Sequence, residues 1–179
     1  MPKWYGGSTL NPDELIPKKD QWTEQWRRVT RWFRRSEKIK KKAEVKELDE
    51  GDIDVLIAFF QNCYHLRDWI SDSRPDLKPK LDRFFEQHFE MRTCRNICDG
   101  YKHKRLTSGK HPDPDFNLYR EYDYFQSDAE PSRSPLLYRI AFAYDNDIKK
   151  YDLFVFTEIC FHLWEEFISK EMSTSANPE

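Results

Sequence analysis

The chain has 179 residues, a formal net charge of −2, and 16% aromatic and 35% charged residues. This length suits one domain with its own core, and the aromatic content excludes a disordered chain, because disordered segments contain few aromatic residues. No run approaches the roughly 20 apolar residues that a transmembrane helix needs, and the first residues do not form an apolar signal segment. We therefore expect a cytoplasmic protein without membrane contacts.

The first half of the chain shows the apolar periodicity of α-helices. An irregular lead-in over residues 1–18 precedes a helix over about 20–46, with Asp20 as its N-cap. Apolar residues at spacings of three and four then predict a second helix over about 52–72. A third helix is expected to begin near Pro79, and a further helical pattern begins at Met91. The sequence leaves open whether these last two form one bent helix or two helices.

The period changes after the helical patterns. Alternating residue types predict a β-hairpin at about 116–144, and a last amphipathic helix is expected over about 151–172. The tail, 173–179, is expected to be mobile. The sequence thus predicts a mainly α fold, with a single helical domain over 19–172. Its architecture would be a helical bundle with a β-hairpin inserted before the last helix.

Tryptophan and cysteine residues lie among the periodic apolar positions. Trp69 and Trp164 are both expected in the core, because each follows the apolar face of its helix. The four cysteines fall on apolar faces and include no C-x-x-C pair, which favours buried, reduced thiols over a zinc site. We therefore predict no metal and no cofactor. The cysteines are Cys63, Cys94, Cys98 and Cys160.

Residues 27–42 are strongly basic, with Glu37 as their one acid, whereas the charged residues of 113–130 are acidic except for Arg120. A basic helix suits nucleic-acid phosphates or an acidic partner. The other interpretation is a solvated face that pairs with acids of the same protein. The candidate nucleic-acid-binding residues are Arg27, Arg31, Arg34, Arg35 and Lys38.

The stretch 94–103 combines polar groups with residues that should face a core. Arg95, Asp99 and His103 are spaced four and four, so they share one helical face. Asp99 would fix the tautomer of His103, Arg95 would stabilise phosphate charge, and His103 would transfer protons. These parts suit a metal-independent phosphodiester transesterification with the RNA 2′-OH as nucleophile. Alternatively, Arg95–Asp99 is an ordinary helical pair and His103 caps the helix.

A second polar cluster, with His65, Arg67 and Asp68, ends the most apolar helix. Some of these groups must lie near the core, and buried polar groups need partners. The face with Arg95 and His103 is the obvious supplier, so we expect the two clusters to meet in one pocket. The alternative is a surface pair of Arg67 and Asp68.

These segments resemble the HEPN-like proteins of prokaryotes, which occur in toxin–antitoxin and phage-defence systems. The resemblance spans about residues 50–170 and rests on His65-Leu66-Arg67-Asp68-Trp69, Arg95-Asn96, Lys102-His103 and the late Leu163-Trp164-Glu165-Glu166. Seven residues separate Arg95 from His103, slightly more than in the usual family signature.

The resemblance implies a metal-independent endoribonuclease that assembles as a homodimer. Arg95 and His103 would be catalytic, with Asn96 as their polar companion. RNA and an antitoxin or a larger defence protein are the partners it implies. The alternative is a non-catalytic protein- or nucleic-acid-binding regulatory module of such a system. The supporting residues would be His65, Arg67, Asp68, Asp99 and Lys102.

Overall fold

The computed structural model describes residues 17–44, 46–103, 116–123, 137–144 and 150–172. Most of these residues are helical, so the predicted mainly α fold is confirmed. The predicted lead-in and tail lie almost entirely outside the described residues. The helical elements are η1 (Lys18–Asp20), α2 (Trp22–Ala43), α3 (Glu50–Ser73), η2 (Pro75–Leu77), α4 (Lys78–Gln87), α5 (Phe89–His103) and α6 (Leu153–Met172).

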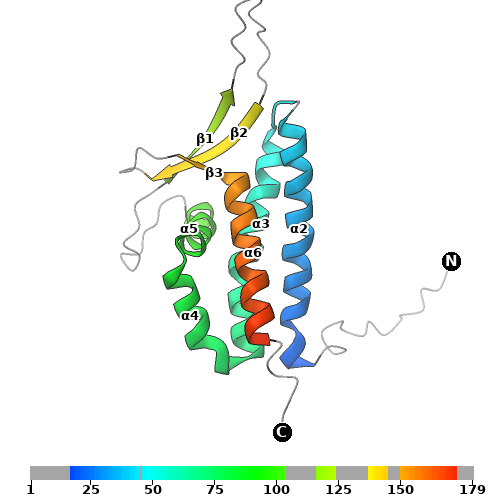
Figure 1. The fold of residues 1–179 in the computed structure, drawn as a ribbon, viewed down its shortest axis with the longest axis vertical. Coiled ribbons are helices and arrows are strands. Elements are labelled where there is room, and N and C mark those ends of the chain that lie inside the picture. The colour runs from blue at the N-terminus through cyan, green and yellow to red at the C-terminus, as the bar shows by residue number, and fades with distance from the viewer. Residues whose placement is uncertain (1–16, 45, 104–115, 124–136, 145–149, 173–179) are drawn as a thin grey trace, which may run out of the picture.

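The helices form a bundle in which α2, α3 and α6 run side by side (Figure 1). α4 and α5 lie on the side of the bundle away from α2, and α5 packs against α3 and α6 (Figure 1). The two long helices α2 and α3 are joined by a short connection. The bundle therefore has two opposite sides, one formed by α2 and the other by α4 and α5.

The ends of the first two long helices differ from the prediction. Asp20 is not the N-cap of α2: Gln21 occupies that position without a side-chain cap, and the Thr23 hydroxyl donates to the Asp20 carbonyl at 2.7 Å. α3 begins at Glu50 because Asp49 and Asp52 form a capping box. The Asp52 amide donates to Asp49 Oδ1 at 3.0 Å, and the Asp49 amide donates to Asp52 Oδ2 at 2.8 Å.

α4 and α5 are two helices, which answers the question that the sequence left open. His88 separates them with φ −102° and ψ 115°, an extended conformation that ends α4. The His88 amide still donates to the Phe84 carbonyl at 3.3 Å, and the His88 carbonyl accepts from the Arg92 amide at 3.1 Å. The chain therefore turns at one residue, and α5 is free to cross against α3.

A small antiparallel sheet precedes the last helix, as predicted. β1 (Phe116–Asp123) pairs with β2 (Leu137–Tyr144), with Phe116 opposite Tyr144. A two-residue strand that the sequence did not predict, β3 (Tyr151–Asp152), pairs with β2. α6 begins at Leu153 rather than at 151, because Asp152 Oδ1 accepts from the amides of Phe154 at 2.8 Å and Val155 at 3.2 Å.

The core is rich in aromatic rings, as the composition indicated. Phe33 of α2 stacks on Phe161 of α6 with centroids 3.9 Å apart, and Trp164 is fully buried with its centroid 5.1 Å from that of Phe84. Trp69 corrects the prediction: it is half-buried, beneath the guanidinium of Arg28. Within the described residues, no helix is long and apolar enough to cross a membrane.

Candidate functional site between α3 and α5

Tyr64 of α3 marks the place where the two polar clusters meet. Burial raises the pKa of its phenol, and the negative charge of Asp99 on α5 raises that pKa further. The positive charges of Arg67 and Arg95 lower the same pKa. These four groups come from two helices that pack directly against each other. Tyr64 therefore lies within electrostatic reach of Arg95 and Asp99 of α5, whereas the predicted contact with His103 concerns a side chain outside the described part of the chain.

Arg67 is fixed by acids on two sides. Its guanidinium donates to Asp82 of α4 at 2.5 Å and to Asp68 at 3.4 Å, and it lies over the Phe85 ring at 5.9 Å. Burial lowers the pKa of Arg67, but the hydrogen bond to Asp82 and the nearby acids raise it further than burial lowers it. Arg67 is thus a half-buried, permanently charged group at the edge of the site.

The residues of α5 differ sharply in exposure. Arg95 and Asp99, one turn apart, are half-buried, whereas Asn96 is fully buried at 0% exposure. At that depth the Asn96 side chain does not reach the surface of the described chain. The backbone of α5 extends to His103. The side chains of Lys102 and His103 lie outside the described part of the chain.

The remaining members of the α3 cluster lie at the rim of the site. His65 is half-buried, with its ring centroid 6.5 Å from that of Tyr64, and Asp68 is exposed. Sequence reasoning gave no role to two residues that the structure places here, Tyr64 and Asp82. Tyr64 could have been found, because it precedes Arg67 by three residues and so shares its helical face. Asp82 could not, because it reaches Arg67 from another helix.

Three thiols from three helices meet in the core. The thiol of Cys94 on α5 donates to the Phe60 carbonyl at 3.3 Å, the thiol of Cys160 on α6 donates to the Glu90 carbonyl at 3.6 Å, and Cys63 of α3 is close enough to Cys94 to affect its pKa. Burial raises the pKa of Cys63 and raises the pKa of Cys94 and Cys160 well above the ordinary value. All four cysteines, Cys98 included, are buried and take part in no disulfide. No group of three ligating residues in the described ranges is placed to hold a metal ion.

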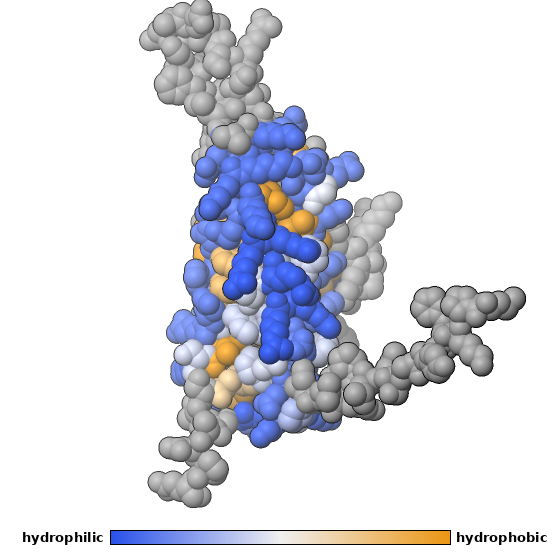
Figure 2. Space-filling model, turned by 90° about the vertical axis from the view of Figure 1, so that its right-hand side faces the viewer, coloured by the Kyte–Doolittle hydropathy of each residue, from blue (hydrophilic) through white to orange (hydrophobic). Residues whose placement is uncertain are grey.

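The five candidate nucleic-acid-binding residues lie together on α2. They line a shallow groove of about 540 Å³ together with Trp26 and Thr30. Figure 2 shows this side of the molecule, where a band of hydrophilic side chains runs down the surface. α2, which carries the groove, and α5 lie on opposite sides of the bundle (Figure 1). The five residues are Arg27, Arg31, Arg34, Arg35 and Lys38.

The chain matches no protein-family model, no curated protein and no solved structure. The described residues define a mainly α helical bundle with a short sheet before its last helix. Its candidate site is a cluster of charged groups around Tyr64, between α3 and α5.

Proposed function

We propose that the chain is a HEPN-like, metal-independent endoribonuclease that acts as an effector in a toxin–antitoxin or phage-defence system. The observation that carries the proposal is the packing of α3 against α5 at Tyr64, whose phenol feels the charges of Arg67, Arg95 and Asp99. α5 continues from these residues to His103. The proposed site thus combines the cations Arg67 and Arg95 with the carboxylate of Asp99. His103 follows one turn later on α5, and histidine ordinarily has a pKa near neutrality.

Each group has a defined task in the proposed reaction. Arg95 binds the scissile phosphate and stabilises the charge that grows on it. The RNA 2′-oxygen forms a bond to phosphorus while the bond to the 5′-oxygen breaks, which leaves a cyclic phosphate and a 5′-OH. His103 takes the proton from the 2′-OH and returns it to the departing 5′-oxygen, because its pKa is ordinarily near neutrality. Asp99, one turn before His103, orients the imidazole.

An RNA-cleavage assay in the presence of EDTA tests this proposal. Arg95→Ala and His103→Ala are each expected to lower the cleavage rate by about 100-fold or more, since each removes a group that acts on the transition state. Two exposed residues elsewhere serve as matched controls: Arg83→Ala on α4 and His162→Ala on α6. Full activity of His103→Ala, or equal losses in the controls, would contradict the proposal.

The second candidate is a non-catalytic protein- or nucleic-acid-binding module of the same kind of system. Two observations favour it: Asn96 is fully buried, and Arg67 is engaged by Asp82 at 2.5 Å. Both are also expected of groups that only stabilise the packing of α3, α4 and α5. Purified protein that binds RNA or a partner but cleaves no RNA would favour this candidate over the enzyme.

The proposal includes a cytoplasmic homodimer with RNA as substrate and an antitoxin or a larger defence protein as partner. It requires neither metal nor cofactor, because histidine and arginine supply the proton transfer and the charge stabilisation. Light scattering at micromolar concentration tests the dimer. A growth-arrest assay on overexpression, with Arg95→Ala and His103→Ala as comparisons, tests the effector role in cells.

A further inference from the structure

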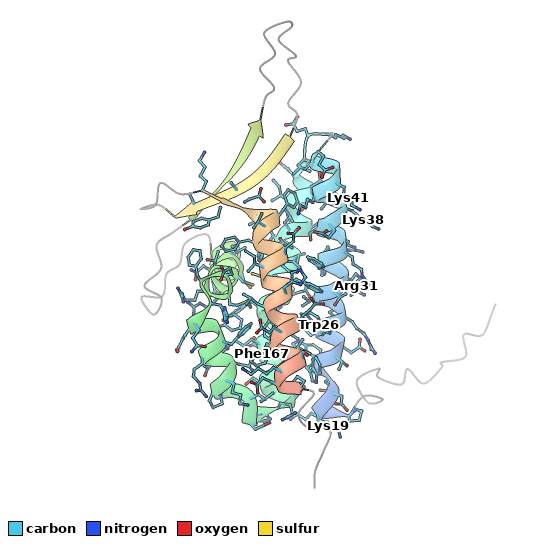
Figure 3. The ribbon with its side chains drawn as sticks, in the orientation of Figure 1. Lys19, Trp26, Arg31, Lys38, Lys41 and Phe167 are labelled. Carbon is cyan, nitrogen blue, oxygen red and sulfur yellow. The ribbon has the colours of Figure 1, made fainter. Side chains whose placement is uncertain are left out.

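The outward face of α2 carries a straight line of cations. Arg27, Arg31, Arg34, Lys38 and Lys41 are spaced four, three, four and three, so they follow one face of the helix for about 21 Å at 1.5 Å per residue. All five are exposed. The labelled side chains of Arg31, Lys38 and Lys41 follow one another along α2 in Figure 3. We call these five residues the α2 stripe.

The structure separates the α2 stripe from the cations that stabilise the fold. Lys40 pairs with Glu158 of α6, and Lys42 pairs with Asp52 at 2.5 Å and with Asp49 at 3.0 Å. Both are less exposed than the members of the stripe. The acids of the chain therefore form ion pairs with the cations that lie beside the packed face of α2.

Most of the α2 stripe has no such acid. Arg27 pairs with Glu24, but Arg31, Arg34, Lys38 and Lys41 form no ion pair with any residue that the structure describes. A row of like charges at helical spacing repels itself and costs stability. Among the described residues no acid forms an ion pair with these four cations, which favours an external polyanion as their partner.

An aromatic side chain lies in the same groove. Trp26 lines it beside Arg27 and Arg31, and its ring stacks on Phe161 with centroids 5.1 Å apart and an interplanar angle of 14°. A second ring, Trp32, is covered by the guanidinium of Arg35 at 4.5 Å. Cations that follow a groove beside a fixed aromatic ring are the arrangement with which proteins bind single-stranded nucleic acid.

Two other negatively charged partners, an anionic membrane surface and an acidic protein, fit this face less well. A membrane-surface helix must insert an apolar face into the lipid, but the apolar face of α2, with Val29 and Ile39, is buried in the bundle. An acidic protein partner usually needs an apolar centre in its interface, and the groove offers only half-buried Trp26. Arginine predominates in the stripe, and its planar guanidinium suits phosphate.

We propose that the α2 stripe, with Trp26, binds the backbone of single-stranded RNA. This inference rests on the proposed function for the choice of RNA, and it names the surface that holds the substrate outside the reacting site. The stripe supplies affinity without sequence specificity, because phosphate contacts carry no base information. Arg31 and Lys38 lie on either side of its middle member, Arg34, and form no ion pair with a described residue.

The test measures binding by fluorescence anisotropy with a 2′-O-methyl RNA of about 12 nucleotides, a length within the usual site sizes. The 2′-O-methyl group removes the nucleophile, so binding is measured without cleavage. Arg31→Gln/Lys38→Gln is compared with Lys78→Gln/Arg83→Gln, which removes the same charges from exposed positions on α4, across the bundle. Far-UV circular dichroism checks that both variants fold.

The α2 variant is expected to bind about tenfold more weakly at low salt, and the slope of log K against log salt should fall by about 1.4, or 0.7 for each lost phosphate contact. The α4 variant should bind as the parent does. A duplex and an abasic strand of equal length should each bind the parent several-fold more weakly, because neither offers free bases to Trp26.

Three results would overturn the inference. They are unchanged binding by the α2 variant, equal weakening by the α4 variant, and equally strong binding of the duplex, of polyglutamate or of anionic vesicles to the parent. Failure of the proposed function is distinguishable, because it appears as intact binding without cleavage of unmodified RNA. Failure of this inference appears as cleavage that persists while the α2 variant binds like the parent.

Discussion

Trp164 is the residue whose removal should cost the bundle most. It is fully buried, and its ring lies 5.1 Å from Phe84, 5.9 Å from Phe85 and 5.7 Å from Phe167. Burial of about 150–250 Å² at about 25 cal/mol/Å² gives about 4–6 kcal/mol as an upper estimate. We therefore expect Trp164→Ala to destabilise the fold by about 3–5 kcal/mol, the range for emptied aromatic core sites.

Trp69 supplies the comparison within the same chain. Because it is half-buried with Arg28 over its ring at 5.1 Å, Trp69→Ala should cost only about 2 kcal/mol, from partial burial and a lost cation–π contact. Trp164→Phe should cost only about 1–2 kcal/mol, because phenylalanine leaves a smaller cavity than alanine does. It also removes a buried N–H that has no hydrogen-bond partner in the described structure, which lowers the cost further.

Urea unfolding followed by far-UV circular dichroism measures all three variants, since this signal does not depend on tryptophan fluorescence. The expected order of destabilisation is Trp164→Ala, then Trp69→Ala, with Trp164→Phe at or below the latter. If Trp164→Ala costs less than about 1.5 kcal/mol, or no more than Trp69→Ala, then the packing of α6 against α4 does not carry the core in the way argued above.

Three further predictions concern the helix cap and the thiols. Asp49→Ala should lower the melting temperature by about 2–4 °C through loss of the α3 cap. The hydrogen bond from Lys42 lowers the pKa of Asp49, so its ionised form adds stability above the unfolded pKa near about 4, and this stability is lost as pH falls through the lower folded pKa. Asp49→Asn, which can still cap, should therefore show a shallower loss of stability in acid titration. Native protein should react with a thiol reagent at pH 8 far more slowly than unfolded protein, because burial raises the pKa of Cys94 and Cys160; rapid native labelling would contradict their burial.

The helices could be predicted because their apolar residues repeat along one face. The break between α4 and α5 could not be placed, because His88 alone leaves the helical conformation and no glycine or proline marks it. β3 was missed for a different reason: two residues become a strand only by pairing with β2. Asp152 was available as a helix-start signal, but the apolar run beside it extended the predicted helix to 151.

The meeting of α3 and α5 followed from a general rule, that polar groups near a core need partners. Which groups would meet did not follow, because Asp82 and Tyr64 depend on how three helices cross. Asn96 was named for another reason, its place directly after Arg95 in the resemblance to HEPN-like proteins. It lies three residues after Thr93, and both are fully buried, a burial that the sequence pattern did not indicate for a polar residue.

The two proposed surfaces place a geometric demand on the reaction. α2, which carries the stripe, and α5 lie on opposite sides of the bundle (Figure 1), so one RNA strand reaches both only by passing around an end of the bundle or by reaching α5 of a second copy. A dinucleotide substrate occupies the reacting site alone. Arg31→Gln/Lys38→Gln should therefore cleave a dinucleotide as fast as the parent, yet show a raised KM and an unchanged kcat on long RNA. Loss of dinucleotide cleavage in this variant would show that α2 acts on the reacting site itself, and the separation of binding from chemistry would then be wrong.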